Sequence, residues 1–315
     1  MTIDIHAHYH PRAYMDAVST ALGHEVKPWA PHPDTDDEEH IERRLRDMAD
    51  AGVTLQVLSP GAGRAPYGAG EATSLAAARL GNDMTAALVA RYPDKFKAFV
   101  TLPLPHIQAS LTELKRAMDL PGMVGLNLHI SAQDRSVAED EFLPIYEEMN
   151  RRKGIIFYHP CGNGICSPMI TDYGLGGAMG TSLEDAAIVA HLIGKKIPSQ
   201  FPDITFVVPH LGGPIAMLLD RLDNQFSMAA RGLPESPSVT ARRFYYDTVG
   251  HASHAALTCA VLAYGADHVL VGSDFPVLHS WETYDRTINW PKDVSLPAGA
   301  VEQIMEKTAA KVLGL

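Results

Sequence analysis

The chain has 315 residues, of which 46% are hydrophobic and 20% are charged, and its formal net charge is -11. This composition is typical of a folded protein with a large core and excludes a disordered one. The acidic balance argues against a surface that binds nucleic acid or an anionic membrane, and no apolar run is long enough to span a bilayer. Because strand-like residues and histidines begin at residue 3, we expect no leader peptide and a cytoplasmic protein.

The first predicted element is a strand over residues 2–8, where apolar and polar positions alternate. Residues two apart on a strand point to the same face, so His6 and His8 should present their imidazoles side by side. Two such imidazoles can chelate one divalent cation, and zinc suits them best. A pair of histidines near a chain end is more often only solvated, so the interpretation depends on the rest of the chain.

Short β-branched or apolar runs recur after this strand, and helical patterns separate most of them. The further predicted strands cover residues 54–60, 97–104, 123–131, 154–160, 204–213, 244–250 and 268–276. Apolar residues between them recur at helical spacing, as at Ile41, Leu45 and Met48, and further helices are predicted over 73–92, 255–264 and 301–313. Eight alternations predict an α/β fold, a distorted (β/α)8 TIM barrel that forms a single domain over residues 1–315. A doubly wound open sheet is the alternative, although no Gly-x-Gly-x-x-Gly fingerprint follows any predicted strand.

Two segments are longer than barrel connections require. Residues 23–37 contain three prolines and two histidines, and residues 161–182 are rich in glycine and follow the fifth predicted strand. Loops that follow the strands of such a barrel cover its active site, so both segments are lid candidates. Cys161 and Cys166 lie in the second segment and could bind metal, but the chain has only one further cysteine, Cys259, and free thiols in a reducing cytosol are favoured.

Polar residues stand at the carboxyl ends of four predicted strands. Besides His6 and His8, the fifth strand ends in His159, the sixth in His210 and the eighth in Asp274. The surrounding runs are apolar, and a buried imidazole or carboxylate needs a partner. A single such histidine is more often a core residue, but five polar groups at one end of a barrel predict a site with metal ligands and catalytic groups.

At this point the sequence resembles the amidohydrolase superfamily, in the branch that contains aminocarboxymuconate-semialdehyde decarboxylase and related aromatic-acid decarboxylases. The resemblance covers essentially the whole chain. It rests on Ile3-Asp4-Ile5-His6-Ala7-His8, Arg46-Asp47-Met48 with Gly52-Val53, Tyr158-His159-Pro160, His210-Leu211-Gly212-Gly213 and Gly272-Ser273-Asp274-Phe275-Pro276. No lysine matches the carbamylated bridging ligand of the binuclear members, which fits a mononuclear site.

The resemblance implies that His6, His8, His159 and Asp274 hold one divalent metal. The ion would be zinc, with manganese as the alternative because ligand type does not separate the two. His210 would stand beside the metal as general acid/base, together with Asp274 as the catalytic residues. A site with five ligands, in which His210 also binds the metal, is the alternative.

Four further residues are candidates for contacting a small carboxylate substrate. Arg64 follows the second predicted strand and suits a carboxylate. Arg231 is the arginine nearest to the position, here Ala229, where the decarboxylase resemblance implies one that enters the neighbouring subunit's site. His251 follows the seventh strand and Phe275 follows Asp274. A solvated side chain is the alternative for both arginines and for His251.

The resemblance favours decarboxylation of a small aromatic or unsaturated carboxylic acid without an organic cofactor, as in the catabolism of aromatic compounds. The alternative is hydrolysis of a lactone, an amide or a carbon–carbon bond of a ring-cleavage product, because the same groups serve both reactions. The resemblance also implies a homodimer.

Overall fold

The computed structural model describes residues 1–26, 36–61, 65–162, 164–226 and 232–315. Its main element is a parallel sheet of eight strands in the order β1-β2-β3-β4-β7-β8-β9-β10. The strands are β1 (Thr2–Tyr9), β2 (Val53–Pro60), β3 (Phe96–Val100), β4 (Met123–His129), β7 (Ile155–His159), β8 (Thr205–Val208), β9 (Phe244–Asp247) and β10 (Val269–Leu270). Each predicted strand is present, which confirms the eight alternations.

The sheet closes because β1 also pairs with the chain that follows β10. Ile5 N donates to Val271 O at 3.0 Å, and Asp274 N donates to His6 O at 2.8 Å. His8 N donates to Phe275 O at 2.7 Å, and a parallel bridge joins Ala7 to Phe275. The closing seam is irregular and β10 is short, so the predicted distorted TIM barrel is confirmed and the open sheet is wrong.

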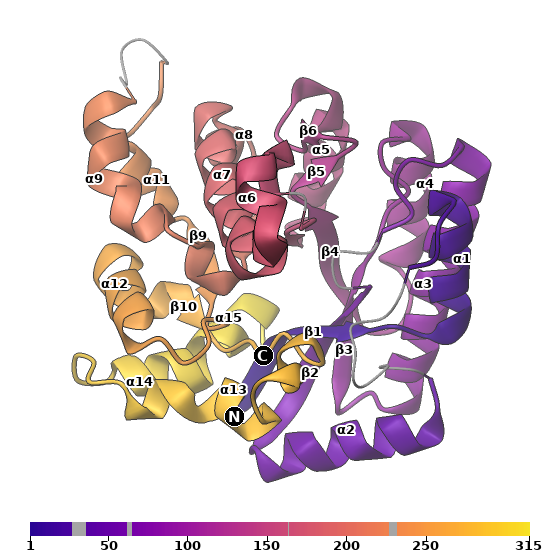
Figure 1. The fold of residues 1–315 in the computed structure, drawn as a ribbon, viewed down its shortest axis with the longest axis horizontal. Coiled ribbons are helices and arrows are strands. Elements are labelled where there is room, and N and C mark those ends of the chain that lie inside the picture. Colours follow the sequence, from indigo (N-terminus) through magenta and orange to yellow (C-terminus); the bar gives the residue numbers. More distant parts are fainter. Residues whose placement is uncertain (27–35, 62–64, 163, 227–231) are drawn as a thin grey trace.

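Helices surround the barrel (Figure 1). The longer ones are α1 (Arg12–Leu22), α2 (Glu38–Asp50), α3 (Glu71–Arg91), α4 (Ile107–Ala117), α5 (Leu143–Arg152), α7 (Thr181–Gly194), α9 (Ile215–Gln225) and α12 (His254–Tyr264). Shorter elements are β5 (Ser131–Ala132), β6 (Arg135–Ser136), α6 (Pro168–Thr171), α8 (Ile197–Gln200), α11 (Pro237–Ala241), α13 (Tyr284–Asn289), α14 (Ala300–Glu302) and α15 (Thr308–Leu313). The sequence patterns had not indicated α1, α4, α7 or α13. None of the helices in the described ranges is both long and apolar enough to cross a membrane.

The barrel interior is filled by apolar side chains from the strands. Ile5, Val57, Phe99, Phe157 and Leu270 form one buried cluster, in which the rings of Phe99 and Phe157 stack at 5.3 Å. The last helix, α15, packs against the same cluster through Ala309 and covers one end of the barrel. Each large apolar side chain buried here contributes about 1.5–3 kcal/mol, so the strands are held firmly and the residues at their ends are well positioned.

A β-bulge in β1 sets the direction of the histidines. Asp4 pairs with Gln56 and Ala7 with Leu58, so β1 has one more residue than β2 between these pairs. The extra residue lets Ile5 and His6 both face the interior, where the His6 ring contacts Phe157 at 4.8 Å between centroids. His6 and His8 then share the interior face, as the alternation predicts.

Candidate metal centre and active site

Four buried residues from three parts of the barrel meet at one point. His6 and His8 come from β1, His159 ends β7, and Asp274 follows β10. One possible ligand atom from each lies within 4.8 Å of the others. His6 Nε2 is 3.1 Å from His8 Nε2, and Asp274 Oδ1 is 2.9 Å from His8 Nε2 and 3.3 Å from His6 Nε2. The structure therefore brings together the four residues that the resemblance implies.

The other ring nitrogen of each histidine has a partner behind the cluster. His6 Nδ1 lies 2.7 Å from Asp247 Oδ2, and His8 Nδ1 lies 2.7 Å from Ser59 Oγ. His159 Nδ1 donates to the carbonyl oxygen of Pro160 at 2.9 Å. Such partners fix the ring orientation and leave Nε2 available for a metal.

The donor set fits a divalent cation. His159 Nε2 is buried and has no hydrogen-bond partner within the described part of the chain, although it faces the cluster. An orphaned buried nitrogen is costly, and a cation would satisfy it together with the close Nε2 atoms of His6 and His8. Three imidazoles and one carboxylate suit zinc, and manganese accepts the same set.

The pKa values reflect how closely these groups are packed. Burial raises the pKa of Asp274, but the histidines around it, His6 first, outweigh this effect and hold that pKa well below its usual range. Burial lowers the pKa of His6, but Asp247 and Asp274 together raise it to about 9. Burial lowers the pKa of His8 to about 4 and also takes the pKa of His159 well below its usual range. The cluster thus holds an ionised carboxylate beside two imidazoles that stay neutral near pH 7.

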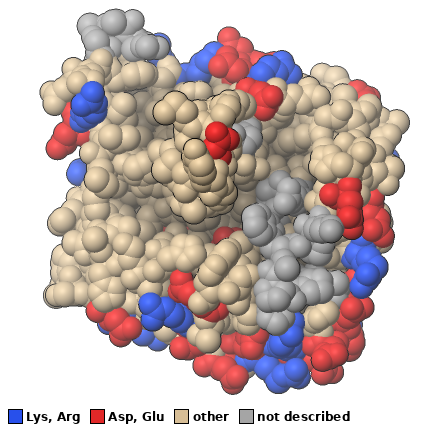
Figure 2. Space-filling view, in the orientation of Figure 1, with Lys and Arg blue, Asp and Glu red and all other residues tan. Residues whose placement is uncertain are grey.

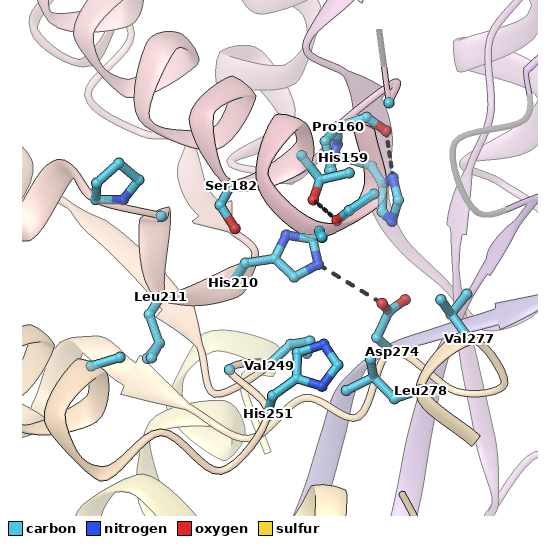
Figure 3. Close-up of a pocket in the computed structure, with 18 of the residues that line it drawn as sticks. His159, Pro160, Ser182, His210, Leu211, Val249, His251, Asp274, Val277 and Leu278 are labelled. Carbon is cyan, nitrogen blue, oxygen red and sulfur yellow. Dashed lines mark hydrogen bonds and ion pairs between the residues drawn. The ribbon is translucent and has the colours of Figure 1, made fainter. Parts of the chain in front are cut away.

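His210 lies beside Asp274 and next to the His6 ring, whose centroid is 5.5 Å from that of His210. It follows β8 in a short turn where His210 and Leu211 both have positive φ, 54° and 55°. Its Nε2 is 3.8 Å from Asp274 Oδ2, an approach that Figure 3 shows across the cavity. Its Nδ1 is 2.7 Å from Asp185 Oδ2, and its backbone N donates to Asp247 Oδ1 at 2.9 Å. Burial lowers the pKa of His210, but Asp185 and Asp274 raise it well above its usual range.

A cavity of about 920 Å³ opens beside His159, His210 and Asp274. Its wall comes from the segments that follow β7, β8, β9 and β10, and none of the described lining residues is a lysine or arginine. Figure 2 shows most of the charged side chains of the described residues at the edges of this face, around a hollow. The apolar part of the wall includes Leu211, Pro214, Ala216, Met217, Val249, Val277, Leu278 and Trp281.

The second lid candidate borders this cavity. In residues 161–182 the chain forms short helical turns, including α6, and then enters α7. Cys161, Gly162, Ala178 and Ser182 line the cavity. Of the first lid candidate, residues 23–37, the part from 27 to 35 lies outside the described residues.

The four substrate-contact candidates differ in where they lie. His251 lines the cavity, and its Nδ1 is 2.9 Å from Glu282 Oε1. Phe275 is not among the lining residues; its ring lies under the guanidinium of Arg44, at 4.5 Å. Arg64 and Arg231 lie outside the described residues.

Sequence reasoning missed the residues behind the site. Asp185 and Asp247 are fully buried and contact the histidines, and Ser59 supports His8. The polar ending of β9, Tyr245-Tyr246-Asp247, was a signal for Asp247. Asp185 had no such signal because it lies in a helix that the patterns did not indicate.

Polar groups gathered at the carboxyl ends of barrel strands define the class of this protein, a (β/α)8-barrel enzyme. The chain belongs to the amidohydrolase family, because the family model described as "Amidohydrolase" matches residues 3–315. This confirms the resemblance on which the implied ligands rest.

Curated relatives of this chain are decarboxylases. It is 24% identical to gamma-resorcylate decarboxylase of Polaromonas sp. over 81% of either chain. It is 27% identical to 6-methylsalicylic acid decarboxylase of Penicillium expansum, over 87% of this chain and 84% of the relative. It is 24% identical to 2-amino-3-carboxymuconate-6-semialdehyde decarboxylase of Dictyostelium discoideum, over 74% of this chain and 66% of the relative.

Solved structures show the same fold. The 5-carboxyvanillate decarboxylase of Sphingomonas paucimobilis is 20% identical, with a TM-score of 0.82 over 100% of this chain and 99% of that one. A dihydroxybenzoic acid decarboxylase of Polaromonas sp., solved with manganese and 2-nitroresorcinol, is 20% identical, with a TM-score of 0.81 over 100% of this chain and 97% of that one.

Proposed function

We propose that this chain is a metal-dependent carboxy-lyase that removes CO₂ from a small aromatic or unsaturated carboxylic acid without an organic cofactor. The observation that carries the proposal is the largely apolar cavity in which His210 faces Asp274, because an apolar wall favours the loss of charge from a carboxylate. The family membership and the decarboxylase activities of the curated relatives support the same reaction.

We infer that His6, His8, His159 and Asp274 hold one divalent ion. Zinc is the first choice because imidazole dominates the donor set, and manganese, present in a structural neighbour, is the alternative. When bound, such an ion supplies positive charge that holds substrate oxygens or activates water. None of the described lining residues is a lysine or arginine, so among these residues the charge of the ion and that of the His210 imidazolium would attract the substrate carboxylate.

His210 is the proton donor in this proposal. Its imidazolium passes the Nε2 proton to the carbon that bears the carboxylate. The bond between that carbon and the carboxylate then breaks, its electron pair restores the unsaturated system, and CO₂ leaves. The net change is one proton taken up and one carboxylate converted to CO₂. The apolar wall favours this step because charge is lost from the carboxylate as it leaves.

Several finer expectations belong to the same proposal. Residues 161–182 act as a lid over the substrate, because part of the segment lines the cavity. Arg64, Arg231 and His251 contact the substrate, and the enzyme is a homodimer in the cytoplasm. Light scattering with an activity assay at the same concentration tests the dimer; a fully active monomer would contradict it.

The reaction class is tested by turnover on a panel of acids and neutral compounds. The panel contains hydroxybenzoates, carboxymuconate semialdehydes, lactones and acyl ring-cleavage products, and both CO₂ and acid release are followed. We expect CO₂ and the decarboxylated product in equal amounts from at least one acid. Acid release from a lactone or a ring-cleavage ketone, with no CO₂ from any compound, would establish the hydrolase alternative instead.

A further inference from the structure

Asp185 lies behind His210, on the side away from Asp274. It belongs to α7, is fully buried, and is not among the described residues that line the cavity. Its Oδ2 is 2.7 Å from His210 Nδ1. The carboxylate therefore contacts the ring nitrogen that does not face the cavity.

The two ring nitrogens of His210 have different partners. The Nε2 edge points to Asp274 across the cavity, as Figure 3 shows, and the Nδ1 edge points to Asp185. An ionised carboxylate can only accept a hydrogen bond, so the proton of the neutral ring must stand on Nδ1. Rotating the ring about its Cβ–Cγ bond would break this contact and take Nε2 away from Asp274.

We propose that Asp185 is the positioning residue of His210, fixing the tautomer and the ring orientation in which Nε2 exchanges protons at the cavity. This inference rests on the proposed function, in which His210 transfers the proton. Asp185 itself gives up no proton: after the Nε2 proton has moved to the substrate carbon, His210 is neutral with Nδ1–H still donated to Asp185. Solvent then returns a proton to Nε2. The arrangement needs no further reactant.

Asp247 also contacts His210, but it binds the backbone of His210 and not the ring. Its Oδ1 accepts from His210 N at 2.9 Å, and its Oδ2 is 2.7 Å from His6 Nδ1. Asp247 thus ties the loop of His210 to β1 but does not reach the His210 ring nitrogens in any contact of the described residues. The orientation of the ring itself is left to Asp185.

A purely structural role explains Asp185 poorly. Its Oδ1 is buried without a hydrogen-bond partner among the residues that the structure describes, and burial raises the pKa of Asp185 to about 6 although His210 offsets part of that effect. The neighbouring Glu184 differs: its Oε2 accepts from the backbone N atoms of Cys161 and Gly162, at 2.6 and 3.1 Å, and so holds the loop after β7. A buried carboxylate with one oxygen that lacks a hydrogen bond lowers the stability of the folded protein, which favours a functional reason for its presence.

The first test measures the protonation of the His210 ring nitrogens by NMR, and the second measures turnover. Metal-free protein labelled with ¹⁵N in its histidine rings is compared by NMR with Asp185→Asn, with His210→Asn to assign the signal, and with Glu184→Gln as the matched buried control. We expect the hydrogen-bonded Nδ1–H signal of His210 in the wild type and in Glu184→Gln, and its loss or clear upfield shift in Asp185→Asn. Asp185→Ser, a smaller neutral side chain, gives the same reading if the Asn variant does not fold.

Turnover separates positioning from stability. In the metal-loaded enzyme, Asp185→Asn should lower kcat by roughly 10²-fold, with KM, metal content and melting temperature nearly unchanged. In the double variant with His210→Asn, the Asp185→Asn substitution should cause no further loss of kcat, because Asp185 acts through the His210 ring. An unchanged Nδ1–H signal in Asp185→Asn, or an equal further loss in the His210→Asn background, would overturn the proposal.

The NMR signal and the turnover together distinguish a failure of this inference from a failure of the proposed function. The NMR signal does not depend on any reaction. If the signal depends on Asp185 but the wild type releases no CO₂ from any acid, the contact stands and both the proposed function and the catalytic part of this inference fall. If CO₂ is released but the signal persists in Asp185→Asn, only the inference about Asp185 falls.

Discussion

Replacing Arg44 by methionine should destabilise the protein although Arg44 does not line the cavity. The side chain is buried in α2, where Nη1 donates to Gln56 Oε1 and Nη2 to His8 O, both at 2.7 Å. Its guanidinium also lies 4.5 Å from the centre of the Phe275 ring. Each charged hydrogen bond whose partner is left buried is worth about 1.5–3 kcal/mol, and the ring contact adds about 1 kcal/mol. Methionine no longer has to bury a charge, which offsets part of this loss, so we expect a net loss of about 3 kcal/mol.

The measurement is thermal and urea unfolding of chelator-treated protein, with Arg46→Met as the matched control. Arg46 is in the same helix, its side chain is 61% exposed, and it makes a surface ion pair with Glu42 at 3.6 Å. Such a pair is worth about 0–0.5 kcal/mol, so Arg46→Met should unfold close to the wild type. Arg44→Met should melt about 5 °C lower. Equal unfolding of the two variants would show that the buried contacts of Arg44 do not hold β1 in place.

Three further changes test the site. His210→Asn should lower turnover by roughly 10²–10⁴-fold while the bound metal is kept, as measured by kinetics and elemental analysis. Full turnover of this variant would show that His210 is not the proton donor. Ser59→Ala removes the partner of His8 Nδ1 and should weaken metal binding by about 10–100-fold, as measured by competition with a chelator. An unchanged metal affinity would mean that Ser59 does not orient the His8 ring. Because the pKa of His6 is raised to about 9 in the metal-free protein, the metal must displace a proton below that pH, and affinity should rise about tenfold per pH unit from pH 6 to 8. The pKa of His8 is lowered to about 4, so His8 adds no pH dependence in this range, and an affinity independent of pH would contradict the protonation assigned to His6.

The fold and the convergence of polar residues at one end of the barrel could be predicted from the sequence because both depend on local patterns, whereas the proposed ligand set came from the family resemblance. Apolar runs at regular intervals gave the strands, and a polar residue at the end of an apolar run is conspicuous, as at His159 and Asp274. The expectation that they meet needed only the geometry of parallel strands closed into a barrel. The convergence of His6, His8, His159 and Asp274 then confirmed the predicted proximity.

The contacts of the supporting residues could not be predicted this way because their partners are remote in sequence; the polar ending of β9 marked Asp247 but not its partner. Asp247 contacts His6 across 241 positions, and Asp185 contacts His210 across 25. The helix α2 shows the same limit: it contains three arginines, Arg43, Arg44 and Arg46, and no local pattern indicates that Arg44 is the buried one. Nor does alternation alone foresee the bulge in β1, because it depends on the pairing with β2.

The central claim is that four buried side chains hold one divalent ion on which decarboxylation depends. Its most direct test is to titrate zinc or manganese into chelator-treated protein while occupancy and CO₂ release are measured on the same samples. We predict that CO₂ release rises in proportion to occupancy and levels off at about one ion per chain, and that His159→Ala neither retains the ion nor releases CO₂. Undiminished CO₂ release from protein that contains no metal would contradict the account.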